Sequence, residues 1–189
     1  AQMINEASRP IIYAGGGVKI SGAEPELLEL AEKADIPVSE SLMGRDVFPA
    51  KHPLCTWMVG MHGTNASNLG ITNSDLVIAI GARFSDRVLG DPKHFAANSK
   101  VLHIDIDPAE INKNISTDAC LVGDVKQVLK ELLPLVNSTK HPEWISKIEE
   151  WKKDIPECYN KEPVDSINPK FICETINKIA GDDTFITTE

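Results

Sequence analysis

Residue types that bind nucleotides recur in this sequence directly after short apolar runs. Glycines occupy positions 15–17, after the apolar run 10–14. Arg83 follows the nearly continuous apolar run 75–80, and Asp105 lies near the end of a further run. Glycine lets the backbone approach a ligand closely, a guanidinium pairs with phosphate or carboxylate, and a carboxylate accepts hydrogen bonds from ribose hydroxyls. Together these residue types indicate a nucleotide site.

The glycine run has two open interpretations. Backbone N–H groups at the start of a following helix can bind phosphate. The run is not a complete G-x-G-x-x-G motif, because Ile20 occupies the last position. The alternative is a tight turn between a strand and a helix.

Arg83, Asp86 and Arg87 lie close together in the segment that follows the run 75–80. Arginine forks recognise phosphate or carboxylate, and Asp86 would orient them. The alternative is a solvated surface ion pair, worth about 0–1 kcal/mol. His62, in a glycine-rich segment, is either a partner for a heterocyclic ring or a structural histidine.

Acidic residues that precede helices have a structural explanation as well. Asp107 comes before Pro108 and Glu110, an arrangement typical of a helix start, so we assign Asp107 to capping. Asp124 also precedes a predicted helix, and its role stays open between a cap and a ligand contact.

We expect no catalytic residue and no metal ligand in this chain. The remaining histidines share no ligand spacing; they are His52, His94, His103 and His141. The four cysteines form no C-x-x-C pair, which argues against a zinc ribbon and a dithiol redox motif. Scattered cysteines of this kind are typical of reduced thiols, so we expect a cytoplasmic protein.

Apolar runs of strand length alternate with segments of helical periodicity. Strands are expected at residues 10–14, 36–40, 75–80, 101–106 and 119–122, and helices at 25–34, 65–71 and 125–135. Such an alternation forms βαβ units that close into a parallel sheet. The sequence therefore predicts an α/β fold: a doubly wound, Rossmann-like parallel sheet of about six strands with helices on both faces. Ligands bind such sheets beyond the carboxyl ends of the strands, where the residues above lie.

The composition of the 189 residues is that of an ordinary globular protein, with 42% hydrophobic and 25% charged residues. A net charge of −9 argues against a general binder of nucleic acid or anionic membranes. No run approaches the ~20 apolar residues that a membrane helix needs. Because the sequence starts without Met and stops inside an apolar run, we expect both ends to be cut from a longer protein.

The predicted domains follow the change in composition along the chain. We expect the doubly wound domain over residues 1–137 and a helix with a linker over 138–168. Residues 169–189 would begin another domain, with a helix over 169–180 and a further strand from Phe185.

Three segments closely resemble the central domain of the acetohydroxyacid synthase (acetolactate synthase) family of large catalytic subunits. They read VGMHGTN at residues 59–65, DLVIAIGARFSDRV at 75–88 and HIDIDPAEI at 103–111. The resemblance covers nearly the whole chain. It implies that this domain binds FAD, without a net redox role, between a pyrimidine-binding and a pyrophosphate-binding domain.

The resemblance also implies an activity for the full enzyme. Pyruvate is decarboxylated with thiamine diphosphate and Mg²⁺, and the two-carbon unit is joined to a second 2-oxo acid, pyruvate or 2-oxobutanoate. The full chain would form a homodimer or homotetramer that is open to a regulatory small subunit. The catalytic glutamate and the magnesium motif belong to domains outside this chain, so we expect the fragment to be inactive alone.

By the resemblance, Arg87 recognises the carboxylate of the second 2-oxo acid. The positions that match FAD contacts are Gly15, Gly16, Gly17, Ser41, Leu42, Met43, Gly60, Met61, His62, Gly81, Arg83, Asp86, Val88, Asp105, Ile106, Asp124 and Val125. Ser85 and Leu89 depart from the family pattern, which usually has Asp and Thr there, but the Asp86–Arg87 pair is kept. The alternatives are a related thiamine enzyme, such as glyoxylate carboligase, and an isolated nucleotide-binding module.

Overall fold

The computed structural model describes residues 1–91, 95–154, 168–181 and 183–187. The chain divides into two compact units, Ala1–Lys153 and Asp154–Glu189. In the second unit, α9 (Pro169–Ile179) begins at Asn168, whose side chain accepts a hydrogen bond from the N–H of Lys170. This helix was predicted; most of the expected linker falls outside the described residues.

The strand predicted from Phe185 is wrong over the described residues 185–187, which have no regular secondary structure. Phe185 is 97% exposed. A strand needs a neighbour to accept and donate its ladder hydrogen bonds, and the described residues of this unit contain no other strand.

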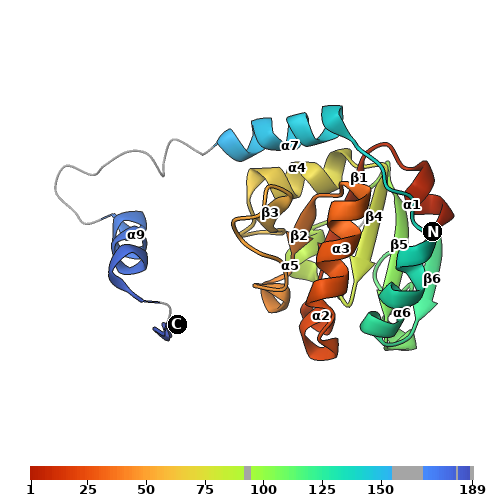
Figure 1. Cartoon of the computed structure of the whole chain (residues 1–189), viewed down its shortest axis with the longest axis horizontal. Coiled ribbons are helices and arrows are strands. Elements are labelled where there is room, and N and C mark those ends of the chain that lie inside the picture. Colours follow the sequence, from red (N-terminus) through yellow and green to blue (C-terminus); the bar gives the residue numbers. More distant parts are fainter. Residues whose placement is uncertain (92–94, 155–167, 182, 188–189) are drawn as a thin grey trace. The chain divides into compact units, whose positions relative to one another are not determined.

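A six-stranded sheet forms the centre of the first unit, in the order β3-β2-β1-β4-β5-β6 (Figure 1). All neighbouring strands are parallel, which confirms the predicted doubly wound fold. The strand order reverses between β1 and β4, and such a switch point opens a crevice at the carboxyl edge of a sheet. The strands are β1 (Pro10–Ala14), β2 (Val38–Glu40), β3 (Cys55–Met58), β4 (Leu76–Ile80), β5 (Lys100–Asp105) and β6 (Ala119–Val122).

Helices cover both faces of the sheet, as the alternating sequence pattern requires (Figure 1). One face carries α2 (Gly16–Ser21), α3 (Glu24–Ala34) and α6 (Val125–Leu132). The other carries α4 (Asn65–Asn73) and α5 (Asp86–Leu89). The remaining elements are α1 (Gln2–Glu6), α7 (Pro142–Lys153) and the short 3₁₀ turns η1 (Leu42–Gly44), η2 (Pro108–Glu110) and η3 (Leu133–Leu135).

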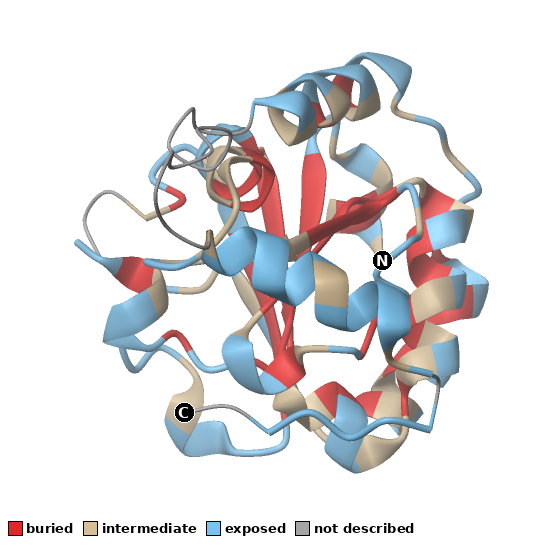
Figure 2. Ribbon diagram, turned by 90° about the vertical axis from the view of Figure 1, so that its left-hand side faces the viewer, coloured by how far each residue is buried: buried red, intermediate tan, exposed pale blue. Residues whose placement is uncertain are grey.

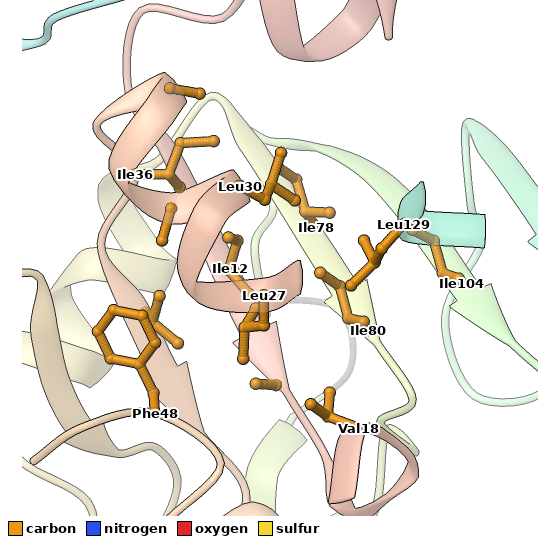
Figure 3. Packing of buried hydrophobic residues seen from close by; sticks show 14 of the residues in the cluster. Ile12, Val18, Leu27, Leu30, Ile36, Phe48, Ile78, Ile80, Ile104 and Leu129 are labelled. Atoms are coloured by element: carbon orange, nitrogen blue, oxygen red, sulfur yellow. The ribbon is translucent and has the colours of Figure 1, made fainter. Parts of the chain in front are cut away.

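The core explains why β1 and β4 are nearly continuous apolar runs. Both strands are buried on each face along their whole length (Figure 2). On the first face, Leu27 and Leu30 of α3 lie over Ile12 and Ile78, and all four side chains are fully buried (Figure 3). Burying one such side chain contributes about 1.5–3 kcal/mol, so this cluster fixes where the ends of β1 and β4 lie.

Helix α7 packs on the first unit, which therefore extends to Lys153, beyond the expected boundary at residue 137. Trp144 and Ile148 are buried, and the indole Nε1–H of Trp144 donates to the carbonyl oxygen of Pro10 at 2.8 Å. The ring of Trp144 also meets the edge of Trp151 at a centroid distance of 5.8 Å. The tryptophans thus serve helix packing.

Strand β3 was missed, because the sequence around it was interpreted as a loop. It has four residues at the edge of the sheet, and Trp57 adopts φ +65° where the register with β2 shifts. Buried hydroxyls secure it: Thr56 donates to the carbonyl of Val38 at 3.0 Å, and Ser67 of α4 donates to the carbonyl of Thr56 at 2.6 Å. Strand β3 therefore completes the sheet of six, of which the sequence located the other five.

Candidate functional site

A pocket of about 690 Å³ opens at the carboxyl edge of the sheet. This volume lies in the range of roughly 300–1,000 Å³ that is usual for small-molecule and cofactor sites. Thirteen predicted site residues line the pocket: Gly16, Gly17, Ser41, Leu42, Met43, Met61, His62, Gly81, Arg83, Arg87, Val88, Asp105 and Ile106. They come from the segments after β1, β2, β3, β4 and β5.

The turn after β1 packs directly on the turn after β4. A Cβ atom on Gly15 would lie 2.1 Å from the carbonyl oxygen of Gly81. A Cβ atom on Gly17 would lie 2.7 Å from the Cα atom of Gly81. Gly81 also adopts φ +55°, in the left-handed region that favours glycine. The tight-turn interpretation therefore explains Gly15 and Gly17. Gly16 differs, because it lines the pocket and a Cβ there would lie 3.1 Å from the carbonyl oxygen of Met43.

The segment after β2 is held by a buried carboxylate. Glu40 is 1% exposed and accepts hydrogen bonds from Arg45 Nη1 at 3.0 Å and from the N–H of Phe48 at 3.2 Å. Its burial raises the pKa of this carboxyl group above its usual value. Ser41 accepts a hydrogen bond from the N–H of Gly44 and so caps η1. Leu42 of η1 thereby stands 71% exposed at the pocket.

The segment after β3 brings Met61 and His62 to the pocket. Gly60 adopts φ +110°, a conformation that L side chains rarely accept. The N–H of Met61 donates to the carbonyl oxygen of Arg87 at 3.0 Å, which joins this segment to the one after β4. Both Met61 and His62 are exposed, so they are available to a ligand.

Two arginines supply positive charge to the pocket. Arg83 and Arg87 are both exposed and line it, and the hydroxyl of Tyr13 donates to the carbonyl oxygen of Arg83 at 3.1 Å. The expectation that Asp86 orients the guanidinium groups is wrong for the described residues. Asp86 starts α5, and its carboxylate accepts a hydrogen bond from the N–H of Arg87 at 2.9 Å instead.

Asp105 places one carboxylate at the end of β5. It is 8% exposed, lines the pocket, and accepts a hydrogen bond from the N–H of Asp107 at 2.9 Å. Beneath it, the buried His103 contacts the carbonyl oxygen of Ala82 through Nε2 at 3.0 Å. Burial lowers the pKa of His103, so its neutral form with a proton on Nε2 fits this contact. Asp107 caps η2, as predicted.

Five predicted positions do not line the pocket: Gly15, Gly60, Asp86, Asp124 and Val125. Asp124 accepts a hydrogen bond from the N–H of Gln127 at 3.1 Å and caps α6, which resolves its structural role. Val125 is 3% exposed and packs in the core. Ligand contacts at these positions stay predictions.

The site contains no recognisable metal centre among the residues that the structure describes. No group of three or more His, Cys, Asp or Glu side chains there is arranged to hold an ion. Within the same residues, every helix is too short or too polar to cross a membrane.

Comparisons with known proteins identify the family of this chain. The family model of the central domain of thiamine pyrophosphate enzymes matches residues 1–132. The chain belongs to this family.

Relatives of this thiamine enzyme domain include acetolactate synthase large subunits. The chain is 48% identical to a probable acetolactate synthase large subunit of Methanocaldococcus jannaschii and 42% identical to the acetolactate synthase large subunit of Buchnera aphidicola subsp. Schizaphis graminum. Both alignments cover 100% of this chain but only 33% and 34% of the relatives. The chain thus spans about a third of their length.

A solved structure shares the fold. An X-ray structure assigned to a thiamin diphosphate-dependent enzyme of Mycobacterium smegmatis matches with a TM-score of 0.62 at 31% identity. The match covers 73% of this chain and 27% of that chain.

Six residues of this thiamine enzyme domain line the pocket without having been predicted: Tyr13, Ile20, Met58, Val59, Ala82 and Ser85. Met58 and Val59 were missed with β3, whose aromatic and apolar residues between Pro53 and Gly60 are the signal that could have found it. Ile20 entered the prediction only as the residue that breaks a glycine motif. It is 89% exposed. The sequence alone offered no sign of this exposure, because an isoleucine in a helix usually packs in the core.

Proposed function

We propose that this chain is the FAD-binding central domain of an acetolactate synthase large subunit. The observation that carries the proposal is the pocket at the carboxyl edge. Its lining includes apolar side chains from the segments after β2 and β3, and charged side chains from β5 and the segment after β4. FAD has the same division, because a flat isoalloxazine ring is joined to a diphosphate and two sugar-like chains.

The apolar part of the pocket suits a flat ring. Leu42, Met43 and Met61 are 71%, 74% and 65% exposed, so ligand binding would remove apolar surface from water. A thioether also makes favourable contacts with aromatic rings. His62, next to Met61, adds a donor or acceptor at the edge of this part.

The charged part suits the diphosphate and the ribose. Arg83 offers a guanidinium fork to phosphate oxygens, and Gly16 leaves room for a ligand to approach the backbone. Asp105 offers carboxylate oxygens to ribose hydroxyls. Arg87, which follows Arg83 in the same segment, would recognise the carboxylate of the second 2-oxo acid.

The reaction proposed for the full enzyme joins pyruvate to a second 2-oxo acid with release of CO₂. When bound, thiamine diphosphate with Mg²⁺ supplies the means to remove CO₂ from pyruvate, and we propose that residues outside this chain hold it. The residues of this chain bind FAD and orient the second substrate. We further propose a cytoplasmic homodimer or homotetramer that accepts a regulatory subunit.

Titration of the purified chain with FAD tests the proposal. We expect quenching of flavin fluorescence with weak affinity, because contacts from the rest of the polypeptide would be lacking. NAD is the comparison ligand. Tight binding of NAD without any affinity for FAD would overturn the proposal and favour an isolated nucleotide-binding module.

A pair of variants sharpens this titration. Arg83→Gln should weaken FAD binding about tenfold or more, because a charge-assisted hydrogen bond is worth about 1.5–3 kcal/mol. The control is Lys130→Gln, which removes an exposed positive charge on α6, away from the pocket. Equal losses in both variants would mean that the overall charge, and not the pocket, governs binding.

The role of Arg87 is tested in the full-length enzyme. Arg87→Ala should raise the requirement for the second 2-oxo acid while the FAD content stays largely intact. The ratio of products and the rate at limiting second substrate are the measurements. An unchanged ratio and rate would count against this role.

A further inference from the structure

A side-chain amide forms hydrogen bonds with both backbone groups of one residue next to the pocket. Asn68 of α4 accepts a hydrogen bond from the N–H of Gly60 at 2.8 Å through Oδ1, and it donates to the carbonyl oxygen of Gly60 at 3.0 Å through Nδ2. The carboxamide thus satisfies both backbone groups of a residue whose φ of +110° no regular element would impose. Asparagine can form both bonds with one side chain, because its carboxamide carries an acceptor oxygen and a donor NH₂ group.

Gly60 is also the point where two pocket segments meet. A Cβ atom on Gly60 would lie 2.7 Å from the carbonyl oxygen of Arg87, and that oxygen accepts the N–H of Met61 at 3.0 Å. The position of Gly60 therefore sets the position of Met61 relative to Arg87. The turn is closed by a third bond, from the N–H of Gly63 to the carbonyl oxygen of Gly60 at 2.9 Å.

A second, smaller pocket lies beside this turn. It has a volume of about 170 Å³, and its lining includes Val59, Asn68 and Val88. Among the contacts of the described residues, the two hydrogen bonds of Asn68 are the ones that join Gly60 to helix α4. Helix α4 is a firm anchor for them, because Ser67 and Ile71 of this helix are buried.

We propose that Asn68 is a positioning residue, which holds the turn of residues 59–63 against Arg87 and thereby fixes Met61 and His62 for the ligand. The consequence for FAD rests on the proposed function. The consequence for the turn itself does not, since it follows from the hydrogen bonds alone. Nothing in the spacing of Asn68 marks it as a ligand contact, and it acts through Gly60.

Hydrogen exchange of the whole chain tests the turn without any ligand. In Asn68→Ala, the amide of Met61 should exchange about tenfold faster, because two hydrogen bonds that hold its neighbour are lost. The matched control is Asn73→Ala on the same helix, whose side chain donates only to the carbonyl oxygen of Leu69 at 2.8 Å in the described structure. An unchanged exchange rate in a folded Asn68→Ala chain would overturn the proposal.

An aspartate variant gives a second readout that a loss of general stability would not produce. In Asn68→Asp, the ionised carboxylate accepts from the N–H of Gly60 but faces its carbonyl oxygen without a donor. Protonation restores an O–H donor beside an acceptor. Exchange at Met61 should therefore slow toward the wild-type rate, after correction for intrinsic exchange, as the pH is lowered from 8 to 5. Asn73→Asp should show no such recovery, and a parallel profile in both variants would contradict the role.

The same variants show whether the turn matters for FAD. We expect Asn68→Ala to raise the dissociation constant for FAD about tenfold, with Asn73→Ala unchanged, at a temperature where circular dichroism shows all chains folded. Wild-type affinity in Asn68→Ala would refute the positioning of the ligand. If the wild-type chain binds no FAD, the proposed function fails while the exchange experiment still decides the role of Asn68 in the turn.

Discussion

The two halves of the pocket are held together by different means. The segments after β1 and β4 meet through glycines, with the backbone of Gly15 and Gly17 in close approach to Gly81. The segments after β2 and β3 also contain glycines in close backbone contact, such as Gly44 and Gly60. They have polar side chains in addition, Glu40 and Asn68, each of which bonds to a backbone group eight residues away in the chain. Close backbone packing leaves no room for adjustment, whereas hydrogen bonds to a side chain can break one at a time. Both halves should therefore be intolerant of added atoms at these glycines, whereas the second half should also be sensitive to the loss of a hydrogen-bond partner.

The largest effect is expected from Gly15→Ala. Its Cβ atom would meet backbone atoms at 2.1 Å, and backbone cannot move aside as a flexible side chain can. We expect a loss of about 3 kcal/mol or more in the free energy of unfolding, at the upper end of what overpacking costs. Urea unfolding followed by tryptophan fluorescence measures it.

Gly16→Ala is the matched control for this comparison. The nearest atom to its Cβ would be the carbonyl oxygen of Met43 at 3.1 Å, which requires a shift of only a few tenths of an ångström. We expect a much smaller loss of stability than for Gly15→Ala. Alanine favours a helix more than glycine does, so helix propensity cannot explain a loss. Equal losses in both variants would show that the contact with Gly81 is not the reason for the cost of Gly15→Ala.

The two halves of the pocket also differ in how well the sequence could predict them. Glycines, an arginine and an acid at the ends of apolar runs are local signals, so the half built on β1, β4 and β5 could be predicted from Gly16, Arg83 and Asp105. The polar supports could not, because an Asn on a helix looks like any other until the fold brings Gly60 to it. The same holds for β3, whose identity as a strand depends on hydroxyl partners in β2 and α4.

A middle-sized, pH-dependent effect is expected at Glu40. Burial raises its pKa in the folded chain, so between the unfolded and folded pKa values the unfolded chain binds fewer protons than the native one. The contribution of Glu40 to stability is therefore fully present below about pH 4.5 and is lost as the pH rises through the folded pKa. The loss is about 1.4 kcal/mol for each pH unit between the two pKa values.

Glu40→Gln isolates this contribution, because the amide oxygen still accepts from the N–H of Phe48 but no longer titrates. The free energy of unfolding of the wild type, minus that of the variant, should fall between pH 4 and pH 8. The control is Glu29→Gln, which removes an exposed carboxyl group from α3. A difference that rises with pH would mean that the Arg45 pair outweighs burial and that the carboxylate is stabilised by the fold.

The smallest effect is expected at Tyr13, where a polar support lies within the glycine-packed half. Tyr13→Phe removes the hydroxyl that donates to the carbonyl oxygen of Arg83 at 3.1 Å and keeps the ring, which lies 5.7 Å from Phe84 between centroids. One hydrogen bond contributes about 1 kcal/mol, and the backbone next to Arg83 is still held by the contact of Gly81 with Gly17. We expect a loss of about 1 kcal/mol in urea unfolding and less than a threefold change in FAD affinity. A change in affinity as large as that in Asn68→Ala would show that this half, too, depends on its polar support, and the contrast between the two halves would not hold.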